Sequence, residues 1–419
     1  AAASLADYDA DGDLDVFIGR YPGPNLLLRN DDGLFLDVAA SLGLERFPYL
    51  SLSGAWADID LDGDLDLLVG NYAEVPPRPE ATKEPSRLYL GSGGGSFEDV
   101  SHWLPERIQL AYTFMNPLID TNGDGYPEIV NITDFFYIQP SGIFVNQAGT
   151  GFLIDLYNGF QMGFNGMGVS IADANGDRIP DFVQSSTGRL SMMLSVPAPD
   201  NPSGAIWIEH AGLRGLAPNR DAGHTFGWGT EWVDIDNDGD LDVAMLWGFW
   251  DDFPSLGPLE DPTWAKDALW IADDEDLLVD RAGEWGFDDT DASRGLIVAD
   301  LDRNGWLDAV KSTINGPTIV LTQRCGSEAW LGIELTDLTA HNRDAVGARI
   351  EVVAGDRSWL RWITAGSTGM FSGGPPTAHV GLGDVERVDR VEILWPDQEL
   401  SVFEDVAVRQ NLEVVRRRR

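Results

Sequence analysis

The sequence is poor in cysteine and in basic residues, and it contains no long apolar run. Cys325 is the single cysteine, so an intrachain disulfide is excluded. Because no stretch reaches about 18 consecutive apolar residues, no membrane-spanning helix is predicted. Lys and Arg total 28 against 69 Asp and Glu, and the formal net charge is −41. Nucleic acid and anionic lipid favour basic partners, so we expect a divalent metal, a cationic partner or a neutral one instead.

Helical periodicity is also almost absent. Short β-rich runs bounded by Gly, Pro, Asn and Asp occur throughout the chain. An apolar content of 43% with 10% aromatic residues excludes wholesale disorder, and 419 residues favour two to four domains. The chain opens AAASLADYD, without an initiator Met or the apolar region of a signal peptide, which indicates processing or trimming upstream.

A nine-residue acidic motif occurs six times. Its copies are DYDADGDLD from Asp7, DIDLDGDLD from Asp58, DTNGDGYPE from Asp120, DANGDRIPD from Asp173, DIDNDGDLD from Asp234 and DLDRNGWLD from Asp300. Each copy is followed by a short apolar run and later by another strand-like segment, so the repeat is one supersecondary unit with loops of variable length. Small antiparallel sheets repeated at this period predict the blades of a β-propeller, because one such sheet cannot bury both faces alone.

The motif has the pattern of a calcium-binding loop. Oxygen donors stand at positions 1, 3, 5 and 9, and Gly usually stands at position 6, where a tight loop needs a positive φ. Oxygen ligands of this number suit calcium better than magnesium, which prefers a stricter octahedron with several waters. Including the backbone carbonyl at position 7, the predicted ligand residues are Asp7, Asp9, Asp11, Asp13 and Asp15; Asp58, Asp60, Asp62, Asp64 and Asp66; Asp120, Asn122, Asp124, Tyr126 and Glu128; Asp173, Asn175, Asp177, Ile179 and Asp181; Asp234, Asp236, Asp238, Asp240 and Asp242; and Asp300, Asp302, Asn304, Trp306 and Asp308.

An EF-hand is excluded, because its loop needs a Glu at position 12 and none of the six copies has one. The motifs contain 24 of the 69 acidic residues, which repel one another without a cation. We therefore predict up to six calcium ions with a mainly structural role. The fourth and sixth copies depart from the pattern, since Arg178 replaces the Gly and Asn304 replaces an Asp.

The acidic loop followed by an apolar strand resembles the FG-GAP/VCBS repeat, which occurs in integrin α-subunit propellers and in many bacterial secreted proteins. The segments NRDAVGARIEVVAG, AHVGLGDVERVDRVEILWP and NLEVV, within residues 330–415, are similar to the ASPIC/UnbV domain. Together the two parts resemble the cartilage acidic protein family over nearly the whole chain. The resemblance implies a secreted, periplasmic or cell-surface protein.

We therefore predict an all-β protein with two parts. Residues 1–326 are expected to form an FG-GAP/VCBS β-propeller of six or seven blades with calcium-binding Asp-rich loops. Residues 327–419 are expected to form a small ASPIC/UnbV-like β-domain.

Ligand binding is predicted on the face opposite the calcium loops. If the metal loop joins the first two strands of each blade, the next loop lies on the other face, and three long insertions fall there, at 71–86, 133–142 and 246–266. Elaborated loops on a rigid scaffold are typical of binding sites. Although most Trp residues are interpreted as core between blades, aromatics interleaved with Asp and Pro indicate a stacking surface or an apolar pocket. The predicted ligand residues are Trp228, Trp247, Trp250, Phe253 and Trp264.

Catalytic candidates are few. The sequence has no G-x-S-x-G, H-E-x-x-H, phosphate-loop or dinucleotide motif. His224 lies in NRDAGHTFGWGTEW, where Arg220, Asp221 and Glu231 could join it in an acid–base group; the competing interpretation is an ordinary loop histidine.

Two functions follow as hypotheses. The first is an extracytoplasmic, calcium-stabilised propeller that binds a glycan, a protein or an apolar small molecule without catalysis. The alternative is an enzyme at the propeller mouth, either a calcium-dependent glycan lyase or hydrolase or a cyclase with a Trp-rich pocket. The oligomeric state stays open.

Overall fold

The computed structural model describes residues 2–20, 23–44, 50–72, 85–108, 112–134, 139–160, 165–216, 225–248, 266–273, 275–314, 316–323, 326–366 and 374–417. Within these ranges the regular structure is almost entirely β, in eight sheets. The helices are single turns, η1 (Ser101–Trp103) and α1 (Ala282–Trp285). None of the described helices is long and apolar enough to cross a membrane. The predicted all-β class is confirmed.

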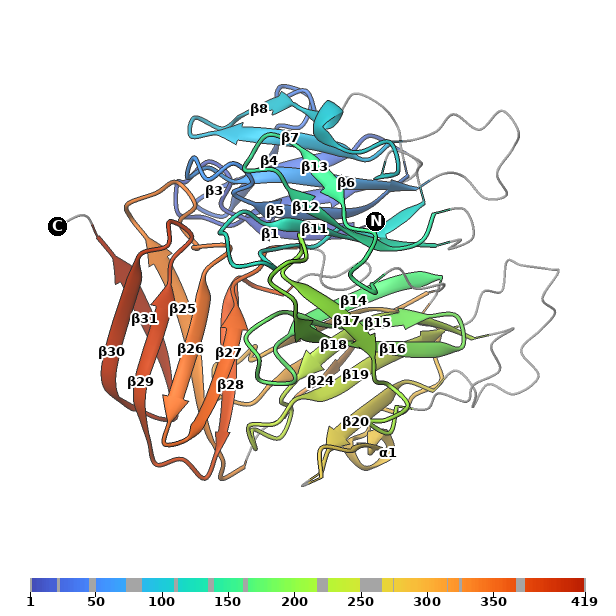
Figure 1. The fold of residues 1–419 in the computed structure, drawn as a ribbon, viewed down its shortest axis with the longest axis vertical. Helices are drawn as coiled ribbons and strands as arrows, with labels where there is room; N and C mark the ends of the chain where they lie inside the picture. The colour runs from blue at the N-terminus through green and yellow to red at the C-terminus, as the bar shows by residue number, and fades with distance from the viewer. Residues whose placement is uncertain are drawn as a thin grey trace.

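Six of the sheets, called blades 1 to 6 here, follow one another along residues 2–321 (Figure 1). Blade 1 contains β1 (Ala2–Ala6), β2 (Asp15–Gly19), β3 (Leu26–Asp31) and β4 (Leu34–Asp37); blade 2 contains β5 (Leu50–Ala57), β6 (Asp66–Tyr72), β7 (Arg87–Ser92) and β8 (Ser96–Asp99). Blade 3 contains β9 (Thr113–Met115), β10 (Leu118–Ile119), β11 (Glu128–Thr133), β12 (Gly142–Asn146) and β13 (Phe152–Ile154); blade 4 contains β14 (Gly166–Ala172), β15 (Asp181–Ser186), β16 (Arg189–Pro197) and β17 (Ala205–Glu209). Blade 5 contains β18 (Phe226–Val233), β19 (Asp242–Gly248), β20 (Ala268–Ala272) and β21 (Leu278–Asp280); blade 6 contains β22 (Ser293–Ala299), β23 (Asp308–Thr313) and β24 (Ile319–Leu321).

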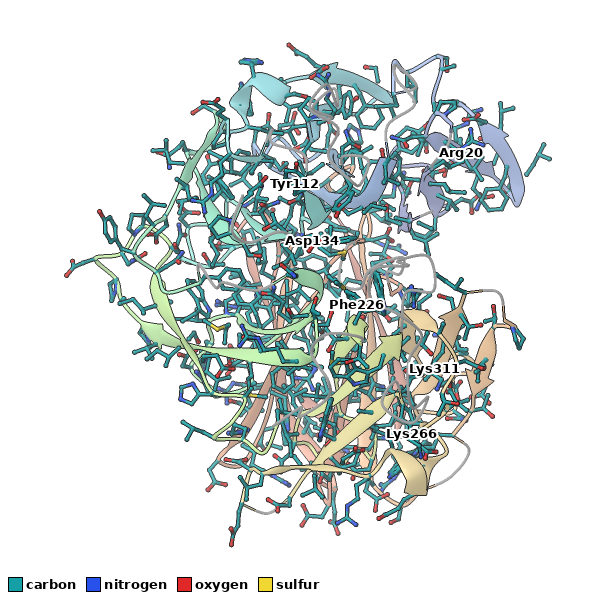
Figure 2. All side chains as sticks on the ribbon, turned by 90° about the vertical axis from the view of Figure 1, so that its right-hand side faces the viewer. Arg20, Tyr112, Asp134, Phe226, Lys266 and Lys311 are labelled. Atoms are coloured by element: carbon teal, nitrogen blue, oxygen red, sulfur yellow. The ribbon has the colours of Figure 1, made fainter. Side chains whose placement is uncertain are left out.

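The blades have the arrangement of a propeller. Each pairs its strands antiparallel in chain order, except that in blade 3 β9 and β10 together take the place of the first strand and both pair with β11. The first strand of each blade contacts the first strand of the next, from β1 through β5, β9, β14 and β18 to β22. Figure 2 shows the sheets placed around a common centre. In the described residues no strand pairing joins blade 6 to blade 1. Of the six or seven blades that the sequence allowed, these residues form six.

Packing between blades explains the apolar run that follows each acidic motif. The second strands β6, β11, β15 and β19 are buried at every residue, because they lie between two neighbouring sheets. In blade 1 the second strand, β2, alternates between buried and half-buried residues, and in blade 6 β23 is buried at three of six residues. The two end blades are therefore less covered than the four between them.

Small residues in the first strands allow neighbouring blades to approach closely near the centre. A Cβ on Gly168 would collide with the carbonyl oxygen of Trp228, and one on Gly229 would collide with Leu296. These contacts account for the glycines in GMGVSIAD and GWGTEWVD, which precede the fourth and fifth acidic motifs.

The remaining seven strands form a two-layer β-sandwich, the C-terminal sandwich. One sheet has the order β28–β25–β31 and the other the order β27–β26–β29–β30. The strands are β25 (Ala329–Asp337), β26 (Arg349–Ala354), β27 (Arg357–Trp362), β28 (Thr377–Gly383), β29 (Arg387–Leu394), β30 (Leu400–Ala407) and β31 (Gln410–Arg416). Their inward-facing Val, Ile, Leu, Ala and Trp residues form one continuous core. The boundary at residue 326 stays a prediction; β24 ends at Leu321 and β25 begins at Ala329.

The C-terminal sandwich lies beside the blades, on the left in Figure 1. It contacts the ends of the blades that carry the acidic motifs, as shown by the hydrogen bond from Asn342 N–H to Gly63 O and by the one from Trp359 Nε1 to Gly239 O. This placement puts the C-terminal sandwich over the candidate metal loops and leaves the opposite ends of the blades uncovered by it.

Candidate metal centres

Each acidic motif forms the loop between the first two strands of its blade, as predicted, and the six loops share one backbone conformation. At position 6 the φ angles run from 70° at Arg178 to 104° at Gly12. Position 4 is left-handed as well, although the sequence did not indicate it; φ is 59° at Leu61 and 60° at Asn237. Two left-handed residues separated by one residue curl the chain tightly, which turns alternate side chains toward one centre.

The carboxylate at position 1 closes every loop. One of its oxygens accepts the backbone N–H of residue 6 at 2.7–3.1 Å in all six copies. The side-chain oxygen at position 5 accepts the N–H of residue 7 at 2.8–2.9 Å, again in all six. Short side chains that hydrogen-bond to the backbone two residues on favour turns over strand or helix. The Asp-rich spacing therefore specifies the loop conformation directly.

The carboxylate at position 9 has a second structural role. It accepts the N–H of residue 2 of its own loop at 2.6–3.2 Å. In five loops its other oxygen accepts a backbone N–H at the end of the third strand, for example that of Gly91 at 2.8 Å from Asp66. These carboxylates are at most 2% exposed. Position 9 thus fastens the loop to its sheet, in addition to the ligand role predicted for it.

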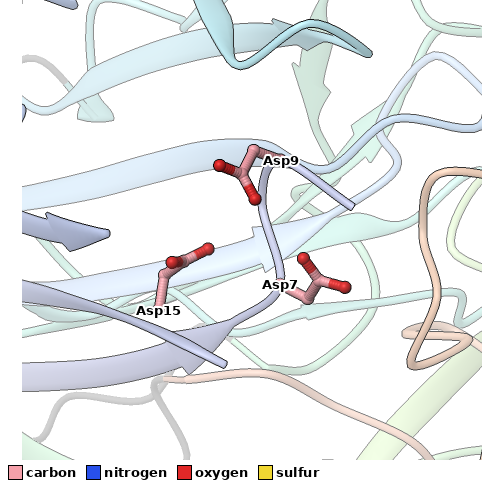
Figure 3. Close-up of side chains that lie close together, drawn as sticks. All are labelled: Asp7, Asp9 and Asp15. Carbon is pink, nitrogen blue, oxygen red and sulfur yellow. The ribbon is translucent and has the colours of Figure 1, made fainter. Parts of the chain in front are cut away.

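In four loops three carboxylates approach closely enough to hold a metal ion together. One oxygen from each lies within 4.8 Å of the others in the groups Asp7, Asp9 and Asp15; Asp58, Asp60 and Asp62; Asp234, Asp236 and Asp242; and Asp300, Asp302 and Asp308. Figure 3 shows the first group, whose three side chains converge on one space. Buried oxygens in these loops also lack a partner, among them Oδ1 of Asp58 and Oδ1 of Asp234, whose residues are 7% and 3% exposed. A buried carboxylate oxygen without a donor fits a cation site.

Burial disfavours the charged form of these carboxylates. It is the largest cause of raised pKa values, which are about 6 for Asp7, about 7 for Asp15, Asp58 and Asp181, and about 8 for Asp234. At Asp7 the neighbouring carboxylate of Asp344, in the C-terminal sandwich, raises the pKa further. A bound cation acts in the opposite direction, because it stabilises the ionised form.

The third and fourth loops have Asn at position 3, and no group of three close carboxylates is found among their described residues. The fourth loop keeps the common backbone nevertheless, since Arg178 adopts a φ of 70° and its N–H bonds to Asp173. Its side chain forms an ion pair with Glu351 of β26. Arg178 therefore replaces the usual Gly without changing the loop and adds a contact to the C-terminal sandwich.

Comparison with protein families agrees with these two structural units. Residues 7–69 match the model described as FG-GAP-like repeat, and residues 338–419 match the model ASPIC and UnbV. The chain contains an FG-GAP-like repeat and an ASPIC/UnbV domain. The FG-GAP-like match includes the first two acidic loops, and the ASPIC/UnbV match covers most of the C-terminal sandwich, so both resemblances seen in the sequence are confirmed.

Two curated relatives are weakly similar to this chain. Cartilage acidic protein 1 of Xenopus tropicalis and that of Homo sapiens are each 26% identical over 196 residues. The alignments cover 43% of this chain but only 28% and 27% of the relatives, so the chain spans about a quarter of their length.

Two solved structures are also similar at low identity. The Vibrio cholerae biofilm matrix protein Bap1 has 12% identity and a TM-score of 0.37, with 96% of this chain and 59% of that chain covered. An engineered GH43 glycoside hydrolase has 11% identity and a TM-score of 0.32, with 94% and 88% covered.

The predicted ligand residues divide into buried ones and ones outside the described residues. Trp228 and Trp247 are 1% and 0% exposed and pack in cores between blades, so their rings do not line an open surface as expected. They are buried because β18 and β19 lie between neighbouring sheets. Trp250, Phe253 and Trp264 lie outside the described residues.

The predicted acid–base group falls mostly outside the described residues, which exclude Arg220, Asp221 and His224. Glu231 is described and half-buried, and its Oε2 accepts a hydrogen bond from Ser170 Oγ at 2.9 Å. It stands three residues before Asp234, toward the acidic-loop end of β18, whereas residues 220–224 precede the other end of that strand. Glu231 therefore lies near the C-terminal sandwich.

Proposed function

We propose that this protein is an extracytoplasmic, calcium-stabilised β-propeller that binds its ligand through the face opposite the acidic loops. The observation that carries the proposal is the set of acidic loops with one backbone, four of which bring oxygens of three carboxylates within 4.8 Å of one another. Asp58 and Asp234, in two of the four close groups, each keep a buried carboxylate oxygen without a hydrogen-bond partner. The weak similarity to cartilage acidic protein 1 supports an extracytoplasmic location.

Calcium is the cation that fits this donor set best. The ligands are oxygens only, and they come from alternate positions of a curled loop, as calcium sites with six to eight oxygen ligands require. Calcium also tolerates the variation between loops, since the number of carboxylates differs from copy to copy, whereas magnesium demands a near-ideal octahedron. The side chains at positions 1, 3, 5 and 9 and the carbonyl at position 7 would hold the ion, which would neutralise their mutual repulsion.

The arrangement of the two parts favours the opposite face for ligand binding. Because the C-terminal sandwich contacts the acidic loops, the opposite ends of the blades, where β6, β11 and β19 end at Tyr72, Thr133 and Gly248, are free of it among the described residues. Most of the residues in the insertions predicted at 71–86, 133–142 and 246–266 lie outside the described residues. Figure 2 looks onto this face, with Tyr112, Asp134 and Phe226 around its middle. Near them Tyr72 donates a hydrogen bond from its Oη to Asp134 at 2.8 Å, and its ring packs edge-on against Tyr112. Aromatic rings beside a carboxylate suit a glycan, a protein side chain or a small apolar molecule.

The metal part of the proposal is tested by removing and restoring calcium. Purified protein is dialysed against EDTA, and its calcium content is measured by elemental mass spectrometry. Its melting temperature is recorded before and after calcium is added back. We expect several bound calcium ions per chain and a large fall in melting temperature that calcium reverses and magnesium does not. A chain that holds no calcium, or that melts unchanged after losing it, would contradict the proposal.

The ligand part is tested by titrating glycans of defined composition and following the chain by isothermal calorimetry. Tyr112→Ala on the face in Figure 2 is compared with Tyr157→Ala, an 84% exposed tyrosine beyond β13. We expect the first variant to weaken binding and the second to leave it unchanged. Equal losses in both variants, or binding unaffected by Tyr112→Ala, would place the ligand elsewhere.

A further inference from the structure

All six acidic loops contact the C-terminal sandwich. Arg178 pairs with Glu351, and Arg303 pairs with Glu334 of β25 at 3.0 Å. Gln398 packs over Gly125 in the third loop, and in the first loop a Cβ on Gly12 would lie 4.0 Å from the guanidinium of Arg343. The second and fifth loops accept hydrogen bonds from the C-terminal sandwich at Gly63 and Gly239. The whole row of candidate metal loops therefore forms one surface that the C-terminal sandwich covers.

Most of these contacts fall on loop positions whose placement depends on the curled backbone. The carbonyl at position 6 accepts a hydrogen bond at 2.8 Å in two different loops, from Asn342 N–H at Gly63 and from Trp359 Nε1 at Gly239. Arg178 also stands at position 6, and Arg303 stands at position 4. Both positions have positive φ in every loop. A loop that uncurls moves these carbonyls and guanidinium groups away from their partners.

Asn237, at position 4 of the fifth loop, makes the largest set of such contacts and is fully buried. Its backbone carbonyl accepts the N–H of Gly383 at 2.7 Å, and its Oδ1 lies 2.7 Å from Nε2 of His379. Its Nδ2 donates to Gly305 O in the sixth loop at 2.9 Å. Burial lowers the pKa of His379 to about 3, so the ring is neutral and its Nε2 carries the proton that it donates. One residue thus joins two acidic loops to the C-terminal sandwich.

We propose that cation binding in the acidic loops and docking of the C-terminal sandwich are one linked equilibrium, with Asn237 as its central contact. This inference rests on the proposed calcium binding. Without a cation the five aspartates of the fifth loop repel one another, and the left-handed turn at Asn237 opens. Because linkage is reciprocal, a docked sandwich raises the calcium affinity of the loops by the same factor that calcium raises docking.

The experiment measures docking in the full chain by electron–electron double resonance. Cys325→Ser removes the native thiol, and spin labels are attached to Leu153→Cys on β13 and Leu400→Cys on β30, two exposed positions on the two parts. With calcium we expect one narrow distance. After EDTA treatment, with calcium loss verified by elemental analysis, we expect a broad distribution that narrows again when calcium returns. A narrow distance that persists in calcium-free protein would overturn the linkage while leaving calcium binding intact; a chain that never binds calcium would overturn both.

Variants at position 4 test the role of Asn237. Asn237→Leu introduces the residue that the second loop carries at the same position, where Leu61 has a φ of 59°. We expect this variant to have a broader distribution of spin-label distances in the presence of calcium. We also expect it to bind calcium roughly tenfold more weakly, within the usual range of coupling between sites. The matched control is Leu61→Asn, which should leave both unchanged. An Asn237→Leu chain with a narrow distance and normal calcium affinity would overturn the role of Asn237.

A charge exchange tests docking without disturbing the core. Arg178→Glu places two negative charges together at the interface, so we expect a broader distribution of spin-label distances. The additional change Glu351→Arg should restore the narrow distribution. If Arg178 only stabilises its own loop, adding Glu351→Arg should not restore the narrow distribution of distances. Equal broadening in the single and double variants would therefore overturn the assignment of this pair to docking.

Discussion

Lys311 and Asp267 form an ion pair of 3.0 Å in which both side chains are completely buried. Lys311 lies on β23 in blade 6, and Asp267 immediately precedes β20 in blade 5, so the pair joins two blades. Nζ of Lys311 also contacts Asp289 and the carbonyl oxygen of Phe287, and Asp267 accepts bonds from Trp247 N–H and Ser293 Oγ. The pair is part of a satisfied polar network inside the propeller.

Removing the lysine from this network should be strongly destabilising. We expect Lys311→Met to lower the free energy of unfolding by about 3–5 kcal/mol, because it leaves the carboxylate of Asp267 buried without its cation. Urea denaturation in calcium measures the change. Arg281→Ala, which breaks an exposed pair with Glu284, is the control and should change stability by about 0–1 kcal/mol. A Lys311→Met chain as stable as the control would contradict the role of the pair.

The calcium-free protein should lose stability as the pH rises. Burial raises the pKa values of Asp7, Asp58 and Asp234 from 3.8 to about 6, 7 and 8. Folding then favours the protonated form, so the stabilisation is complete below about pH 4 and is lost as the pH passes from about 6 to 8. Melting temperatures in EDTA between pH 4 and 9 check the direction. In the presence of calcium, the melting temperature should fall much less over the same pH interval. A calcium-free protein that becomes more stable as the pH rises would refute the expectation.

Positions 5 and 9 of the acidic loops should respond differently to substitution. In the second loop, Asp66→Ala removes the acceptor of two backbone N–H groups, those of Ile59 and Gly91, whereas Asp62→Ala removes one exposed contact to Asp64 N–H. We expect Asp66→Ala to cost about 2–4 kcal/mol even in EDTA, because it leaves buried donors unsatisfied. Asp62→Ala should lower the free energy of unfolding mainly in the presence of calcium. Denaturation of both variants with and without calcium distinguishes the two, and equal losses in EDTA would be contrary to the assignment.

At position 178 in the fourth loop, glycine should be more stable than alanine. Arg178 has a φ of 70°, a conformation that is unfavourable for residues with a side chain by roughly 1–2 kcal/mol. Arg178→Gly and Arg178→Ala both remove the ion pair with Glu351, but only the glycine relieves the backbone. We therefore expect Arg178→Gly to be more stable than Arg178→Ala by about 1 kcal/mol in denaturation experiments. No difference between the two would show that the left-handed turn carries no strain.

The repeated strands and loops were predictable because their signals are local. The apolar runs after each motif correspond to β2, β6, β11, β15, β19 and β23, and the glycine at position 6 has the expected positive φ. The second role of position 9 was not predictable, because the N–H of Gly91 that reaches Asp66 comes from a strand 25 residues away. The burial of Trp228 and Trp247 was also missed, since the sequence does not show which faces of β18 and β19 neighbouring blades cover.

The sequence by itself determined the acidic loops and the sheets that flank them. Alternating aspartates bond to their own backbone within nine residues, so each loop carries the information for its curl. The tertiary structure alone decided what the loops face. Asn237 and His379 are 142 residues apart, and they meet only because the C-terminal sandwich packs on the acidic-loop ends of the blades. Such a contact depends on the shapes of two assembled surfaces, which no local pattern of residues encodes.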